Sequence, residues 1–168
     1  IDGVYNQLAK WKSLGILDSN TPNTINSVVD YKDTSKQLSI AINEPIYLSG
    51  IQLFGEKKYM TAYHKWNEVY TREPNYKDVK NKLQQALNER YKEGSYYLMQ
   101  ENFKEAAMAF EQVKNININY LDVKNLYKES SCEPIYRKAV KDLKIKKCRT
   151  AFFDLDKMIQ NFDAYKNS

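Results

Sequence analysis

Residues 47–78 have the sequence YLSGIQLFGEKKYMTAYHKWNEVYTREPNYKD, and this stretch determines the fold that we predict. Gly50 is followed twelve residues later by Ala62, and the large aromatic Trp66 comes four residues after that alanine. Small side chains let two helix backbones approach closely, and a large apolar side chain one turn later fills the space between neighbouring units. The stretch therefore predicts two closely crossing helices, one containing Gly50 and the other containing Ala62.

The same spacing recurs twice further along the chain. Its three positions are occupied by Gly50, Gly94 and Ala139, by Ala62, Ala106 and Ala151, and by Trp66, Phe110 and Leu155. A tyrosine-containing segment recurs in phase, with tyrosines at positions 31, 76, 120 and 165, which are 45, 44 and 45 residues apart. A fixed period of tens of residues is the signature of a repeat protein, so we predict an all-α repeat fold.

The recurring tyrosine segment is predicted to begin a helix in each repeat. Its copies are Asp30-Tyr31-Lys32-Asp33, Asn75-Tyr76-Lys77-Asp78, Asn119-Tyr120-Leu121-Asp122 and, with alanine at the cap position, Asp163-Ala164-Tyr165-Lys166. An Asp or Asn in first place can cap a helix, because its side-chain oxygen accepts from a free backbone N–H, and an aspartate three residues later favours the helix dipole. Pro45 and Pro134 are expected to kink or restart two of these helices, whereas the middle one, over residues 76–100, is expected to be continuous.

The register from Gly50 through Ala62 and Trp66 to Pro74 resembles that of the tetratricopeptide repeat (TPR) family. The resemblance covers about residues 43–163, although Ile118 replaces the closing proline in the second copy and the third copy is weaker. The family period is about 34 residues, so the longer period here is expected to lengthen the first helix of each pair. The lengthened copies also resemble degenerate repeats of bacterial proteins that carry a recurrent Asp-Tyr-Lys-Asp segment.

The resemblance implies a short right-handed α-solenoid of TPR-like antiparallel helix pairs. We assign residues 1–29 to an N-terminal helical cap, because Val4, Leu8, Trp11 and Leu14 form one apolar stripe and the terminal units of solenoids are atypical. Residues 30–168 are assigned to three elongated repeats, at about 30–74, 75–118 and 119–163, plus a short C-terminal end. These repeats are expected to form a single structural unit.

The resemblance also implies where a partner would bind, because in this family the first helix of each pair lines the concave surface. The family's groove positions fall on Tyr47, Tyr91 and Tyr136, on the adjacent Leu48, Lys92 and Arg137, and on Asn88 one turn away. A row of tyrosines flanked by two cations suits a protein or peptide that carries acidic or aromatic groups. The alternative, which large side chains at repeat spacing favour, is that the tyrosines fill the gap between adjacent units.

A second candidate surface is the densest cluster of positive charge in the chain. It consists of Lys141, Lys144, Lys146, Lys147 and Arg149, and should fall at the turn between the last two helices. Cations near a helix C-terminus complement its dipole and are ordinarily solvated. The functional alternative is contact with nucleic acid or with anionic lipid headgroups, for which we find no sequence motif.

Catalytic, metal and cofactor sites are not indicated by the sequence. His64 is the only histidine, there is no glycine-rich phosphate loop, and the two cysteines have no metal-binding spacing. Cys148 takes the place of Tyr59 and Phe103 in the repeat, so we predict a buried thiol there. About 20 Å of helix separates Cys132 from the turn before Cys148, so no disulfide is expected between them.

These observations predict a non-catalytic scaffold that binds a protein or peptide, without a cofactor and as part of a larger assembly. The alternative is an architectural spacer that self-associates, and a weaker alternative is binding of nucleic acid or anionic membrane through the basic cluster. A net charge of +5 is too small to indicate nucleic-acid binding, and no apolar run is long enough to cross a bilayer. The chain begins at Ile1 rather than Met, so a bacterial envelope protein with its anchor removed is favoured over a cytoplasmic one, and membrane contact is expected only through such an anchor.

Overall fold

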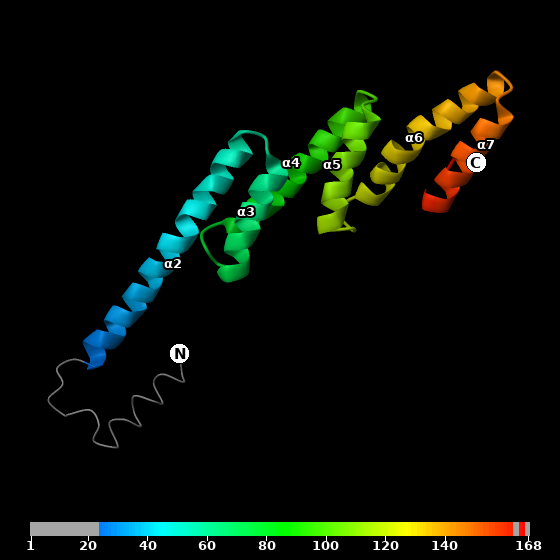
Figure 1. The fold of residues 1–168 in the computed structure, drawn as a ribbon. Coiled ribbons are helices and arrows are strands. Elements are labelled where there is room, and N and C mark those ends of the chain that lie inside the picture. The colour runs from blue at the N-terminus through cyan, green and yellow to red at the C-terminus, as the bar shows by residue number, and fades with distance from the viewer. Residues whose placement is uncertain (1–23, 163–164, 167–168) are drawn as a thin grey trace, which may run out of the picture. The chain divides into compact units, whose positions relative to one another are not determined.

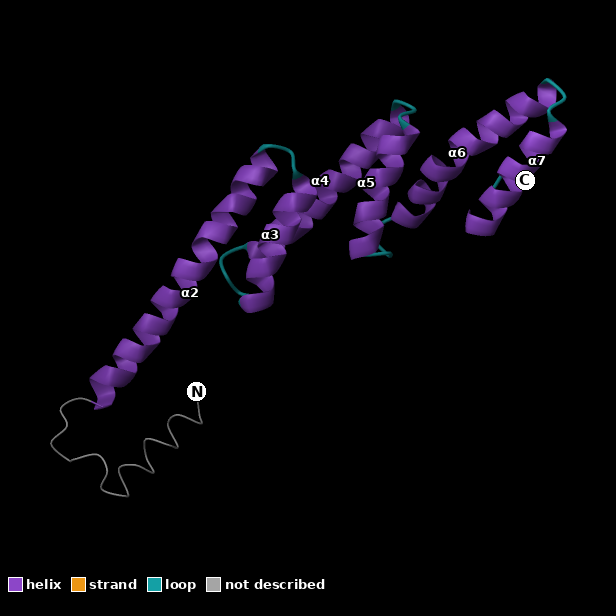
Figure 2. Cartoon of the chain, in the orientation of Figure 1, coloured by secondary structure: helices purple, strands orange, loops and turns teal. Residues whose placement is uncertain are grey.

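The computed structural model describes residues 24–162 and 165–166, with side chains from residue 34 onward. The described residues form six α-helices and contain no β-strand (Figures 1 and 2). They are α2 (Thr24–Gly55), α3 (Tyr59–Arg72), α4 (Val79–Met99), α5 (Phe103–Ile116), α6 (Val123–Lys144) and α7 (Cys148–Phe162). The all-α prediction is confirmed, whereas most of the predicted N-terminal cap lies outside the described residues.

The chain divides into two units, and the boundary lies within α2. The first unit is Ile1–Glu44, and its described part is helical from Thr24. The second unit is Pro45–Ser168, in which each helix from α3 to α6 packs against the helix that follows it in the chain. The second unit contains both candidate surfaces and the three repeated helix crossings.

The predicted close crossing of helices is confirmed in the second unit. A Cβ atom built on Gly50 would lie 2.3 Å from Nε1 of Trp66, and one built on Gly94 would lie 3.0 Å from Cε1 of Phe110. Both aromatic side chains are completely buried, and the Trp66 indole donates a hydrogen bond of 3.1 Å to the carbonyl oxygen of Tyr47. Glycine is therefore required at residue 50, because a side chain there would occupy the space of the indole ring.

The turn within each helix pair has the same hydrogen-bonded form in all three copies. The first helix ends in a left-handed residue, which is Lys57, Glu101 or Lys146, with φ of 59°, 57° and 62°. In the first copy, the N–H of Lys58 donates to Leu53 O at 2.9 Å and the N–H of Lys57 donates to Phe54 O at 3.0 Å, and the other two copies repeat this pair of bonds. This is the Schellman arrangement, which satisfies carbonyls at the end of a helix.

The helices that follow the turns between successive pairs begin later than predicted. Residues Lys77, Leu121 and Lys166 are left-handed, with φ of 46°, 46° and 49°. Because this conformation interrupts the helical backbone, α4 and α6 begin at Val79 and Val123 rather than after Asn75 and Asn119. Asp78 and Asp122 become the residues that precede the helices, and neither makes a side-chain cap bond.

The helices continue through both prolines and through the first tyrosine segment. Pro45 lies inside α2 and Pro134 lies inside α6, and neither helix restarts there. The backbone is already helical at residue 30, so the segment at residues 30–33 does not begin a helix. The middle helix is continuous as predicted, from Val79 to Met99.

The two cysteines are free, but their environments differ from each other. Cys132 is completely buried in α6, whereas Cys148 is exposed at the start of α7, so the prediction that Cys148 is buried is wrong. No helix in the described part of the chain has the length and hydropathy needed to cross a bilayer.

Candidate interaction surfaces

The predicted tyrosines lie at the junctions between successive helix pairs. At the first junction the rings of Tyr47 and Tyr76 pack edge to face, with centroids 6.0 Å apart. The Tyr47 hydroxyl donates a hydrogen bond to the Asp78 carboxylate, and this bond lowers the pKa of Asp78. The Lys77 ammonium lies 4.9 Å from the centroid of the Tyr47 ring. The tyrosine of one pair is therefore held by the turn that begins the next pair.

The second junction repeats this arrangement one period later. The Tyr91 and Tyr120 rings pack edge to face at 5.7 Å, and the Tyr91 hydroxyl donates to the Asp122 carboxylate. In the other direction, the Tyr120 hydroxyl donates to Oδ1 of Asn88 at 3.4 Å. Burial and the bond to Asp122 raise the pKa of Tyr91 to about 12. Each junction thus combines a stacked tyrosine pair with hydrogen bonds between one helix pair and the next.

At the third junction a buried glutamate takes the place of Asn88. Tyr136 packs against Tyr165 at 6.1 Å, and the Tyr165 hydroxyl donates to Glu133 at 2.7 Å. Glu133 also accepts from Lys166 and, at 2.9 Å, from Nε of Arg137, although the residue is only 8% exposed. Burial alone would raise the pKa of Glu133, but these three donors outweigh it and lower the pKa to about 2. The carboxylate is therefore held ionised at the junction.

The three tyrosines fill the space between helix pairs, as the alternative interpretation of the sequence has it. Tyr47 is 8% exposed, whereas Tyr91 and Tyr136 are half-buried. Asn88 is also half-buried, and its side-chain oxygen is engaged by Tyr120. The hydroxyls of Tyr47 and Tyr91 are used within the fold, so a partner would meet the edges of these rings at most.

The two predicted cations are exposed but already paired. Arg137 makes two bonds to the carboxylate of Glu101, at 2.8 and 2.9 Å, and its guanidinium lies 5.0 Å from the ring centroid of Phe103. Lys92 pairs with Glu89 at 2.7 Å on its own helix. These pairings raise the pKa of both cations. An acidic partner would have to compete with these carboxylates, which costs little at an exposed position.

One face of the first helices carries exposed apolar and cationic side chains, among which Leu48, Lys92 and Arg137 occupy equivalent repeat positions. We call this set the outer row: Leu48, Ile51, Lys92, Tyr96, Met99, Arg137 and Lys141. Its large apolar members are 53%, 39%, 60% and 80% exposed, in the order of the chain. Within α4, the positions 92, 96 and 99 are spaced by four and three residues, so they lie on one helix face. Sequence reasoning named Leu48, Lys92 and Arg137 but missed Tyr96 and Met99, which their spacing of about one and two helical turns from Lys92 could have indicated.

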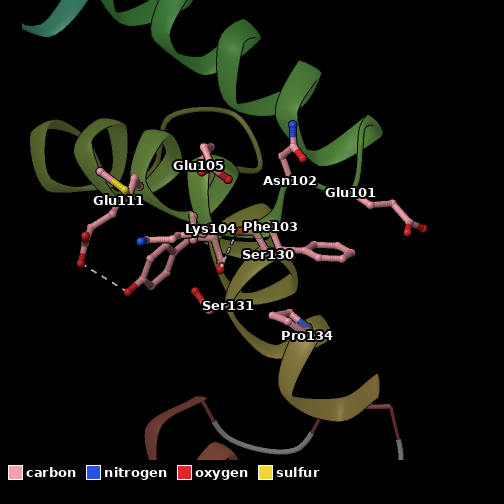
Figure 3. Close-up of a pocket in the computed structure, with 12 residues that line it drawn as sticks. Glu101, Asn102, Phe103, Lys104, Glu105, Glu111, Ser130, Ser131 and Pro134 are labelled. Carbon is pink, nitrogen blue, oxygen red and sulfur yellow. Dashed lines mark hydrogen bonds between the residues drawn. The ribbon is translucent and has the colours of Figure 1, made fainter. Parts of the chain in front are cut away.

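A cleft of about 560 Å³ lies between α5 and α6 and was not predicted (Figure 3). Figure 3 shows Phe103 and Pro134 at one end of the cleft and Glu111 at the other. The Ser130 hydroxyl donates to two backbone carbonyls of α6, at 2.7 and 3.1 Å. The Tyr127 hydroxyl donates to Glu111 at 3.4 Å. The polar groups of the cleft are thus largely satisfied within the fold.

A small residue lines the cleft at a position that is aromatic in the other two copies. Ala107 lines the cleft, and the equivalent residues one period away are Tyr63 and Phe152. Tyr63 packs against a hydrophobic core cluster that includes Trp66 and Val79, whereas Phe152 is 64% exposed. We therefore interpret the cleft as a gap in packing rather than as a built ligand site.

The basic cluster lies at the turn between α6 and α7, as expected. Lys141, Lys144, Lys146, Lys147 and Arg149 are all exposed there. Leu143 and Ile145, which are 47% and 54% exposed, alternate with these cations. Whether Leu143 and Ile145 are exposed depends on which side chains pack over them in the folded protein, so their exposure could not be predicted from the sequence.

Among the described side chains, those of residues 34–162 and 165–166, no three His, Cys, Asp or Glu groups are placed to hold a metal ion. Comparison of the chain with protein-family models, with curated proteins and with solved structures gave no match.

Proposed function

We propose that this chain is a non-catalytic scaffold that binds a protein or peptide partner along the outer row. In this proposal the helix pairs form a right-handed, TPR-like solenoid, and the first helices of the pairs present their exposed face to the partner. The observation that carries the proposal is the outer row itself, because four large apolar side chains stand exposed beside cations on the first helices. Exposed apolar groups in such an arrangement mark interaction surfaces.

The partner that fits this surface is an amphipathic segment with acidic groups. Tyr96 and Met99 offer aromatic and flexible apolar contacts, which are favoured at binding hot spots. Lys92 and Arg137 would attract carboxylates of the partner, which would replace Glu89 and Glu101 as their ion-pair partners. The buried tyrosines of the junctions would support the surface by keeping successive first helices at a fixed spacing.

The proposal is tested by selecting ligands from a peptide library displayed on phage and measuring the affinity of the selected peptides by fluorescence anisotropy. The variant Tyr96→Ser/Met99→Ser should weaken binding by about tenfold or more. A matched control is Ile116→Ser/Ile118→Ser, which removes two exposed apolar side chains at and just after the end of α5. Circular dichroism verifies that both variants are folded.

Two results would contradict the proposal. One is the selection of peptides without acidic or apolar enrichment, and the other is an equal loss of affinity in the outer-row variant and its control. A salt series with the selected peptide should show weaker binding at higher ionic strength, since exposed charge pairs are screened.

An architectural role is the second candidate, and the exposed face of α7 favours it. Phe152, Phe153 and Ile159 are 64%, 57% and 38% exposed on the last helix. Heterologous contact of this face with a different surface of the next copy would give an assembly that grows end to end. Light scattering over a range of protein concentrations tests this role, because the mean mass should rise with concentration and fall in Phe152→Ser/Ile159→Ser. A constant monomeric mass would exclude self-association.

A further inference from the structure

The cations of the turn between α6 and α7 have no carboxylate partners. In the part of the chain that the structure describes, the side chains of Lys141, Lys144, Lys146, Lys147 and Arg149 make no ion pair or hydrogen bond. The nearest carboxylates along the chain are those of Asp142 and Asp154, and both pair with Lys138, the former at 4.0 Å. The turn therefore presents a concentrated positive charge to its surroundings.

Apolar side chains are exposed within the same turn. Leu143, Ile145 and Phe153 are 47%, 54% and 57% exposed. Leu143 is uncovered because Cys148 replaces an aromatic residue, whereas in the first copy the Tyr59 ring packs 5.3 Å from that of Phe54, the counterpart of Leu143. We call these three apolar residues and the five cations the basic tip.

The basic tip is particular to the third copy and is not required by the turn geometry. All three turns share the Schellman bonds and the left-handed residue, yet their four turn residues differ. They are Gly55-Glu56-Lys57-Lys58, Met99-Gln100-Glu101-Asn102 and Lys144-Ile145-Lys146-Lys147. Because the backbone tolerates all three sets, the lysines and isoleucine of the third turn are not explained by folding.

We propose that the basic tip docks onto the surface of a membrane that contains anionic phospholipids. Lysine and arginine side chains near such a surface are attracted by its negative potential, and adjacent apolar side chains can enter the boundary between headgroups and acyl chains. Leu143 and Ile145 favour lipid over nucleic acid, because aliphatic side chains cannot stack on bases as aromatic ones do. The turn would enter tip first, and the Phe153 ring, with the Arg149 guanidinium 5.8 Å from its centroid, would follow one turn behind.

The test is sedimentation of the full chain with lipid vesicles. Vesicles of phosphatidylcholine alone are compared with vesicles of phosphatidylcholine mixed with phosphatidylglycerol, at low and high salt. The chain should bind only the anionic vesicles, and binding should weaken as salt rises. The variant Lys144→Gln/Lys146→Gln/Lys147→Gln should bind about a hundredfold more weakly.

Matched controls separate the tip from the net charge of the chain. Lys80→Gln/Lys124→Gln/Lys157→Gln removes the same charge from exposed positions elsewhere and should bind as the unmodified chain does. Ile145→Ser should lose about tenfold, because a buried isoleucine contributes this much on entering an apolar environment.

The contact itself can be observed through Cys148, the exposed thiol at the tip. A fluorophore sensitive to polarity can be attached there, since Cys132 is buried. Its emission should shift to the blue with anionic vesicles and stay unchanged with neutral ones. Circular dichroism verifies that labelled and variant chains are folded.

Three outcomes would overturn the proposal. The first is a lack of binding to anionic vesicles at low salt, and the second is an equal loss of binding in the tip variant and its charge-matched control. The third is tighter binding to a polyuridine oligonucleotide that depends on the tip lysines and not on Ile145, which would assign the tip to nucleic acid.

Discussion

Replacing Gly50 with alanine tests the helix crossing on which the repeat depends. The added Cβ would lie 2.3 Å from Nε1 and 2.7 Å from Cδ1 of Trp66. The indole is completely buried and hydrogen-bonded to the Tyr47 carbonyl, so it has no free space to move into. We expect Gly50→Ala to displace Trp66 and to destabilise the first helix pair.

The expected loss of stability follows from three contributions. Overpacking of a filled core costs about 1–3 kcal/mol, and loss of the indole hydrogen bond costs about 1 kcal/mol. The alanine itself favours the helix by about 1 kcal/mol relative to glycine. The net result for Gly50→Ala is a loss of about 2 kcal/mol. At Gly94 the nearest atoms are 3.0 and 3.1 Å away, so Gly94→Ala should stay within about 1 kcal/mol of the unmodified chain.

The measurement is equilibrium unfolding in urea, followed by circular dichroism. The third helix pair supplies a natural comparison, since it combines Ala139 with Leu155 at the corresponding positions. The double variant Gly50→Ala/Trp66→Leu copies that combination. Its loss of unfolding free energy should be smaller than the sum of the losses in the two single variants, by about 1 kcal/mol or more. A Gly50→Ala chain that is more stable than the unmodified one, as helix propensity alone would make it, would refute the packing argument.

Four further changes have defined outcomes in the same assay. Lys57→Gly should stabilise by about 0.5–1 kcal/mol, because glycine adopts the left-handed conformation without a steric penalty, and an unchanged urea midpoint would contradict this. Tyr91→Phe should cost about 1 kcal/mol of unfolding free energy by removing the hydrogen bond to Asp122. Asp122→Asn should then cost less in the Tyr91→Phe variant than in the unmodified chain. The pKa of Glu133 falls from 4.5 in the unfolded chain to about 2 in the folded one, so the ionised carboxylate contributes about 3 kcal/mol to the free energy of unfolding. This contribution is present above pH 4.5 and is lost as pH falls toward 2, and the variant Glu133→Gln should lack this pH dependence. Ala107→Tyr should fill the cleft between α5 and α6 and raise stability by about 1 kcal/mol, and a destabilised variant would show that the cleft cannot accept the ring.

The repeated junction explains how successive helix pairs keep a constant spacing. At the first two junctions a tyrosine hydroxyl donates to the aspartate of the next turn, and the bonded residues are 31 positions apart in both copies. Such bonds couple neighbouring pairs and do not reach beyond them. The stability of the second unit is therefore expected to depend on nearest-neighbour contacts, as in other repeat proteins.

The period and the helix crossings could be predicted from the sequence alone. Gly50, Ala62 and Trp66 recur in register with their counterparts, and the requirement for a small side chain opposite a large one follows from helix geometry. The N-cap prediction at Asn75 was wrong for a reason that the local sequence does not contain. Asp78 is bonded by Tyr47, and the left-handed Lys77 delays the helix to Val79.

The sequence by itself thus determined which residues repeat and which helices cross, because both depend on spacing along the chain. Only the tertiary structure decided the roles of the candidate site residues. The Tyr47 hydroxyl donates to Asp78, which lies 31 residues away in the sequence, and Arg137 pairs with Glu101, which lies 36 residues away. Cys148 is exposed, and it leaves Leu143 uncovered, because no aromatic side chain closes the turn in the third copy. Burial and pairing of this kind depend on residues distant in sequence, which spacing alone does not place together.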